Sequence, residues 1–129
     1  MDETTKDEIR SIINEVFQSN SQVLMISLND ETGLPILTFT RNPDDSISEI
    51  TDPGITNRYA ALAGASTSLG DRTLSTLSQE RVRLIHVQGK DRDVAIAVSS
   101  KLISLVVTIP SGSPNIIAEK LNAQLKAKI

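Results

Sequence analysis

The single histidine and the one glycine–lysine pair are the first residues to test for chemistry. His86 is the only histidine and the chain has no cysteine, which excludes a metal centre built from several histidines or from thiolates. No nucleophile near His86 completes a catalytic pair. Gly89-Lys90 lacks the upstream glycine of a phosphate-binding loop and follows a strand-like run without opening a helix. We therefore interpret His86 as a partly buried strand residue and Gly89-Lys90 as a hairpin turn.

Carboxylates and arginines gather in two other places. Asp44, Asp45 and Glu49 are close in sequence, but their spacing differs from that of a calcium loop, so a solvated loop is the better interpretation. Arg58 and Arg72 fall on or near the exposed side of a predicted helix, where one of them could act as an arginine finger in nucleotide hydrolysis. Such arginines more often solvate a helix or join an ion pair. We predict no catalytic, metal-binding or cofactor-binding residue, and no cofactor.

The composition indicates one globular domain spanning residues 1–129. Hydrophobic residues make up 39% and charged residues 22% of the chain, which is ordinary for a soluble protein. A net charge of −3 and only three aromatic residues argue against a nucleic-acid partner. The acidic N-terminus lacks the features of a secretory signal, and no run approaches the roughly 20 apolar residues of a membrane span. We expect a cytoplasmic protein that does not insert into membranes.

The segment 55–77 is the long helix around which the other elements are predicted to assemble. One stripe of this helix has the spacing of a core-facing surface, and it consists of Ile55, Tyr59, Leu62, Ser66, Leu69, Thr73 and Leu77. The opposite side carries small residues instead of the usual charges, namely Ala61, Gly64, Ala65, Ser68 and Ser75. Because small residues let another backbone approach, we predict that a partner covers this side. The alternative is that the chain's own terminal helices pack there.

The remaining segments alternate between helical and strand-like patterns. An amphipathic helix carrying Ile9 to Phe17 precedes a hairpin of strands 23–28 and 34–40. A polar loop over 41–52 leads to the long helix, which is capped by Thr51 or Asp52 and has Pro53 in its first turn. Strands 81–87, 94–99 and 102–109 and a terminal helix that starts at Ser113-Pro114 follow. Hairpin connections make the sheet antiparallel, and three helices suffice to cover both faces. The predicted class is α/β, an α+β sandwich with five strands in the order α-β-β-α-β-β-β-α.

Several of these segments together resemble the Roadblock family, small domains related to dynein light chains and to bacterial and archaeal regulators of Ras-like GTPases. The resemblance is carried by the hairpin 23–28 with Gly33-Leu-Pro-Ile36, the helix start 57–63, and the strand blocks 82–87, 94–98 and 105–109. It implies a five-stranded antiparallel sheet with the long helix on one face and the terminal helices on the other.

The resemblance also implies how the chain meets its partners. Family members form homodimers or heterodimers in which the strand corresponding to 81–87 pairs with its twin and the long helices lie side by side. Carried onto this chain, the dimer interface comprises Ala61, Gly64, Ala65, Ser68, Arg81, Val82, Arg83, Leu84 and Ile85. The implied GTPase-binding positions are Asn57, Ala61, Ser68, Asp71, Arg72 and Ser75.

These observations predict a binding module rather than an enzyme. The chain is expected to dimerise with itself or with another Roadblock protein and to dock onto a Ras-like small GTPase, as an activator or as a scaffold. One alternative is an adaptor subunit of a motor or membrane complex with no effect on nucleotide turnover. A small-ligand sensor is disfavoured, because few aromatic side chains are available to line a pocket.

Overall fold

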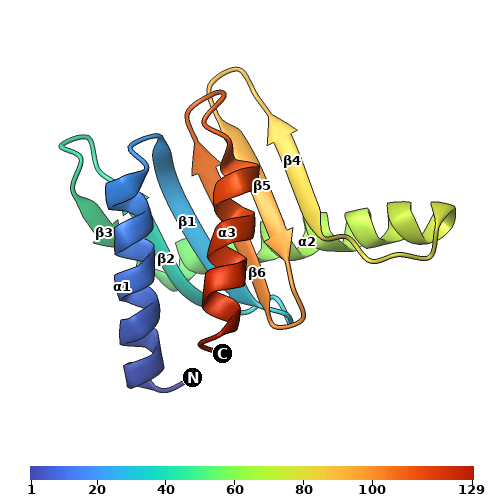
Figure 1. Cartoon of the computed structure of the whole chain (residues 1–129), viewed down its shortest axis with the longest axis horizontal. Coiled ribbons are helices and arrows are strands. Elements are labelled where there is room, and N and C mark those ends of the chain that lie inside the picture. The colour runs from blue at the N-terminus through green and yellow to red at the C-terminus, as the bar shows by residue number, and fades with distance from the viewer.

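Six antiparallel strands and three helices make up the fold in the computed structural model, which describes all residues 1–129 (Figure 1). The elements are α1 (Glu3–Ser19), β1 (Val23–Asp30), β2 (Pro35–Arg41), β3 (Ile47–Glu49), α2 (Pro53–Leu77), β4 (Leu84–Gln88), β5 (Asp93–Val98), β6 (Leu102–Thr108) and α3 (Pro114–Lys126). The strand order across the sheet is β3-β2-β1-β6-β5-β4. The predicted α+β class is confirmed, and the predicted number of five strands is wrong.

The strand missed from the sequence is β3, which lies in the stretch that was predicted to be a polar loop. Its three residues pair with the end of β2, where Phe39 aligns with Glu49 and Arg41 with Ile47. Glu49 also accepts a hydrogen bond from Arg10 Nε of α1 at 2.9 Å. A three-residue strand has too little alternation to be seen locally, because the pairing that defines it comes from the edge of β2.

Helices α1 and α3 cover one face of the sheet, which we call the closed face (Figure 1). Its core holds 16 buried apolar residues, among them Ile13 and Phe17 of α1 and Leu121 of α3. Buried Ala95 and Ala97 let α3 lie close to β5, and Asn122 Nδ2 donates to the Ala97 carbonyl at 3.0 Å. The small side chains of β5 on this face are therefore covered by a helix.

Helix α2 crosses the opposite face, which we call the open face (Figure 1). Asp52 caps the helix by accepting a hydrogen bond from the Gly54 amide at 2.9 Å, and Pro53 occupies the first turn, as predicted. The buried residues of α2 are Ala60, Ala63 and Thr67. None of the three helices combines the length and the apolar character needed to cross a membrane.

The predicted core stripe of α2 is confirmed at Tyr59, which packs against the open-face core, and is wrong at its leucines. Leu62, Leu69 and Leu77 are 53%, 64% and 78% exposed, so they do not face the sheet. Small side chains lie beneath α2 instead, which allows its backbone to approach the sheet closely. Hydrophobic spacing identified an apolar stripe correctly, but it could not tell whether the sheet or a partner covers that stripe.

Candidate protein-interaction surface

The outer strand β4 is an open sheet edge. Leu84–Gln88 pairs with β5 on one side only, which leaves backbone donors and acceptors free on the other. The strand contains neither proline nor lysine, the residues that commonly protect such edges. The opposite edge differs, because β3 is only three residues long and its Glu49 is held by Arg10. Thus β4 is the edge suited to pairing with another chain.

His86 lies on β4, on the strand position that the sequence predicted. Its side chain is 30% exposed, and Nε2 is 4.0 Å from the carboxylate of Asp93. Asp93 is buried and accepts a hydrogen bond from the Ser111 amide at 3.0 Å. This arrangement ties the loop before α3 to the β4–β5 hairpin, and no nucleophilic side chain is hydrogen-bonded to either residue.

Apolar side chains lie next to β4 on the open face. One row of cross-strand neighbours runs from Met25 on β1 through Val107 on β6 and Val94 on β5 to Val87 on β4. Exposure along this row rises from 8% at Met25 to 55% at Val87, since α2 does not cover its outer end. We define the apolar flank as this row's outer members together with the neighbouring stripe of α2, namely Val87, Val94, Val107, Tyr59, Leu62 and Leu69.

The C-terminal end of α2 projects beyond β4 (Figure 1). The last point of attachment is near Gly70, where a Cβ atom would come within 2.9 Å of Val82 Cγ2, so the linker packs directly against the helix backbone. Asp71 Oδ1 accepts from the Val82 amide at 2.7 Å and Oδ2 from Arg81 at 3.2 Å. The Val82 amide and the Arg81 guanidinium lower the pKa of Asp71. Beyond this anchor the helix has no sheet beneath it, and Leu77 is left exposed.

The other flank of α2 borders what we call the small-residue groove. Two adjoining hollows of about 400 and 450 Å³ lie between α2 and the β1–β2 and β5–β6 turns, and they share Glu31, Thr67, Arg81 and Ile103. The α2 side of the groove is lined by Ala61, Gly64, Ala65 and Ser68. An added Cβ at Gly64 would touch nothing within 4 Å. This flank can therefore accept another backbone, as its small residues suggested.

The structure divides the residues predicted for the dimer interface between two places. Ala61, Gly64, Ala65 and Ser68 line the small-residue groove together with Arg81 and Val82 of the linker, whereas Leu84 and Ile85 lie on β4. Of the predicted GTPase-binding residues, Asp71 is held by the linker and the others are exposed on α2, namely Asn57, Ala61, Ser68, Arg72 and Ser75. No three side chains of the histidine, cysteine or carboxylate type gather where they could hold a metal ion.

The sequence reasoning did not assign the apolar flank to any interface. The spacing predicts Leu62 and Leu69 to be core residues and Val94 to be a strand residue, and Val87 enters a contact only as the end of the strand 81–87 that the resemblance pairs with its twin. A usable signal existed, because the stripe on α2 contains two small polar residues, Ser66 and Thr73, between its large apolar ones. Such a mixture is more typical of an interface between proteins than of a buried core.

Comparison with known proteins identifies the fold. No family model and no curated protein sequence matches this chain. A solved structure described as MglB with tetrameric arrangement superposes with a TM-score of 0.76 at 12% identity, covering 99% of this chain and 92% of the other. The gliding protein MglB from Thermus thermophilus gives 0.75 at 12% identity, with 99% and 93% coverage. A Roadblock/LC7 domain from Streptomyces avermitilis gives 0.64 at 18% identity, with 88% coverage of each chain.

The chain therefore has the fold of Roadblock/LC7 domains. The resemblance that the sequence motifs indicated is confirmed at the level of the fold, over nearly the whole chain.

Proposed function

We propose that this chain, acting as one domain over residues 1–129, is a non-catalytic cytoplasmic module that dimerises and docks onto a Ras-like small GTPase to regulate it. The main support for a dimer is that the open β4 edge lies directly beside the apolar flank. A free strand edge and an exposed apolar surface are separately costly to leave in water, and one partner can cover both.

A second copy of the chain fits both features through a two-fold axis next to β4. Antiparallel pairing of β4 with its copy would join the two sheets and remove the open edges. The projecting end of α2 would then lie over the sheet of the second copy and beside that copy's own α2. Leu69 and the outer row of the sheet, including Val87, would become buried in this arrangement.

In this proposed dimer the two α2 helices meet through a different side of the helix from the one that the family resemblance implies. It places the two α2 helices together through Leu62 and Leu69 rather than through Ala61 and Gly64, because the leucines expose more apolar surface. The strand part, 81–85, is retained. Arg81 and Arg83 are engaged by Asp71 and Glu119 respectively, so they are not free charges that would prevent pairing at this edge.

A GTPase is the proposed partner of the side that this dimer leaves uncovered. The Roadblock resemblance implies such a partner, and the structural likeness to MglB supports the same class of module. On this chain the contacting residues would be Asn57, Ala61, Ser68, Arg72 and Ser75, while Asp71 holds the linker in place. Because the surface offers no catalytic constellation, regulation would work by ordering the GTPase's own switch loops.

The test is binding to purified Ras-like GTPases loaded with GDP or with a non-hydrolysable GTP analogue, followed by single-turnover GTP hydrolysis. A regulator should prefer one nucleotide state and change the hydrolysis rate. Arg72→Glu should weaken binding about tenfold, whereas Arg92→Glu in the β4–β5 turn serves as the matched control. Equal binding to both states with no change in rate would favour the adaptor function, and binding to no GTPase would overturn the proposal.

A further inference from the structure

The backbone of β4 presents a fixed pattern of free hydrogen-bonding groups along its outer edge. At one end of the strand the Val98 amide donates to the Arg83 carbonyl at 2.9 Å. At the other end the Gly89 amide donates to the Arg92 carbonyl at 2.9 Å. Antiparallel strands exchange hydrogen bonds at every second residue, so positions 83, 85, 87 and 89 face β5. The residues between them direct their N–H and C=O groups away from the sheet, and these are Leu84, His86 and Gln88.

These outward-facing residues restrict how a second copy can pair with β4. Antiparallel pairing about a two-fold axis forms hydrogen bonds only where outward-facing residues meet each other. With the axis at His86 all of them find a partner, because His86 lies opposite His86 of the second copy and Leu84 lies opposite Gln88. The free donors and acceptors of the strand are then satisfied.

The neighbouring registers are poorer. An axis at Ile85 brings Val82 into the pairing, but the Val82 amide already donates to Asp71 Oδ1 at 2.7 Å. An axis at Val87 brings in Lys90, which lies in the turn beyond the end of the strand. The side chains favour the same choice, since the first register sets Ile85 against Val87 of the second copy on the open face, where apolar meets apolar.

In the favoured register the single histidine of the chain lies on the dimer axis. His86 is aligned with Ala95, a residue of the closed-face core, so its side chain projects from that face of the sheet. The two copies of His86 would have Cα atoms about 5.5 Å apart, the separation of directly opposed residues in a hydrogen-bonded pair. Their imidazoles are therefore neighbours across the axis.

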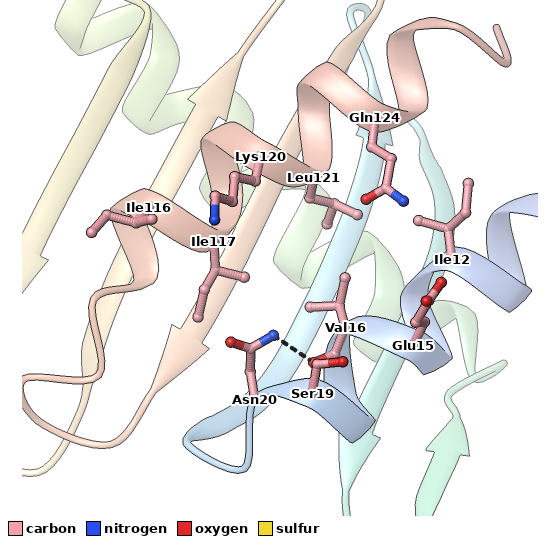
Figure 2. Close-up of a pocket in the computed structure, with 10 residues that line it drawn as sticks. All are labelled: Ile12, Glu15, Val16, Ser19, Asn20, Ile116, Ile117, Lys120, Leu121 and Gln124. Atoms are coloured by element: carbon pink, nitrogen blue, oxygen red, sulfur yellow. Dashed lines mark hydrogen bonds between the residues drawn. The ribbon is translucent and has the colours of Figure 1, made fainter.

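Each imidazole also has charged neighbours within its own chain, and these are present in the monomer and in the dimer alike. Asp93 Oδ2 lies 4.0 Å from His86 Nε2. On α3, Glu119 is paired with Arg83, and Lys120 lines the hollow between α1 and α3 (Figure 2). The β4–β5 turn carries three solvent-exposed charges, namely Lys90, Asp91 and Arg92. The charge that pairing sets directly against the imidazole is that of the second copy's histidine, when it is protonated.

We propose that β4 pairs with its copy in this register and that protonation of the two His86 side chains weakens the dimer. The inference rests on the proposed dimerisation through β4 and adds its regulation. An ordinary histidine gains its proton at about pH 6.5, and a second positive charge next to the first is disfavoured. Asp93 lies beside each imidazole in both states, so it does not remove this difference. The dimer thus binds fewer protons than two monomers, and its dissociation constant rises as the pH falls.

Cross-linking of single-cysteine variants tests the register, since the chain has no cysteine of its own. An axis at His86 places Ile85 opposite Val87 of the second copy with Cα atoms about 4.5 Å apart, which a disulfide can bridge. A mixture of Ile85→Cys and Val87→Cys chains should therefore form a covalent dimer under mild oxidation, and neither variant alone should. Cross-linking of one variant alone, or of no combination although the chain is dimeric, would overturn the register and leave the dimer itself standing.

Light scattering over a dilution series at about pH 8 and about pH 5.5 tests the histidine pair. The dissociation constant of the wild type should rise roughly tenfold at the lower pH, which lies between the water and protein-surface limits for two unit charges a few ångström apart. His86→Gln removes the charge and should dimerise equally well at both pH values. Circular dichroism establishes that the variants are folded.

The matched control moves the histidine along the same edge by combining His86→Gln with Gln88→His. The two introduced histidines are then about 14 Å apart, beyond the screening length of about 8 Å at physiological salt, so the pH should have little effect. A wild-type dimer that is insensitive to pH, or a pH effect that persists in His86→Gln, would contradict the role of the histidine pair. A wild type that is monomeric at both pH values would instead overturn the dimer on which the inference rests.

Discussion

The two faces of the sheet use helices in opposite ways. On the closed face α1 and α3 present large side chains to the strands and take part in a core of 16 buried residues. On the open face a 25-residue helix buries only Ala60, Ala63 and Thr67, and the core there has five residues. The longest helix therefore packs on the smaller core, and its leucines Leu62, Leu69 and Leu77 are exposed.

This difference separates folding from association. Large side chains buried on the closed face supply the apolar area that stabilises a monomer. Small side chains under α2 keep the helix close to the sheet, and its large side chains remain available at the β4 edge. Substitutions on the closed face should therefore change the free energy of unfolding, whereas substitutions on the apolar flank should change the dissociation constant of the dimer.

The largest expected effect is in the closed core. Phe17 of α1 is 1% exposed, and Phe17→Ala should lower the free energy of unfolding by about 3–5 kcal/mol, since it removes a buried ring and leaves a cavity. Urea denaturation followed by circular dichroism measures this loss. Leu62→Ala, at a side chain 53% exposed, is the control for the open face and should cost the monomer less than about 0.5 kcal/mol. Equal losses would mean that the two faces do not differ as described.

A smaller effect is expected where α2 rests on the sheet. Ala63 is fully buried, and Ala63→Leu would force the helix away from the strands, costing about 1–3 kcal/mol of unfolding free energy. Ala65→Leu, at an exposed position two residues along the same helix, should be close to neutral. If thermal unfolding shows both variants to be equally stable, the close approach of α2 is not a constraint on the fold.

The smallest expected effect concerns the anchor of the α2–β4 linker. The Val82 amide and Arg81 lower the pKa of Asp71 below 3.8 in the folded chain, so its carboxylate stabilises the fold at pH values above 3.8. That contribution is lost as the pH falls through the lowered pKa. Asp71→Asn should reduce the unfolding free energy by about 1 kcal/mol at pH 7, and the difference from the wild type should shrink below pH 3.8. A difference that is independent of pH would contradict this role.

The sequence predicted every long element of the fold because each has its own periodicity or cap. Asp52 with Pro53 located the start of α2, and the run 102–109 located the strand β6, which the structure buries on both faces. The strand β3 escaped prediction because its only support is hydrogen bonding to β2, and nothing in Ile47–Glu49 itself reports that contact.

The candidate surface was less predictable, because a helix can place its apolar stripe toward its own sheet or toward a partner. Leu62 and Leu69 have the spacing of core residues in both cases. The direction of the stripe is decided by how closely the α2 backbone can approach the sheet. This distance depends on the contacts of Ala60, Ala63 and Thr67 with strand residues such as Ile103 and Leu105. That match is a tertiary property with no local signature.

The central claim is that a second copy of this chain covers the apolar flank, and the mass in solution of three proteins tests it most directly. Light scattering should give twice the 14.0 kDa of one chain for the wild type. Leu69→Arg should give a folded monomer, because an arginine on the flank would be buried without a partner on both sides of the dimer. Gly64→Arg, in the small-residue groove, should remain a dimer. A monomeric wild type, or a dimer lost in Gly64→Arg and kept in Leu69→Arg, would contradict the account.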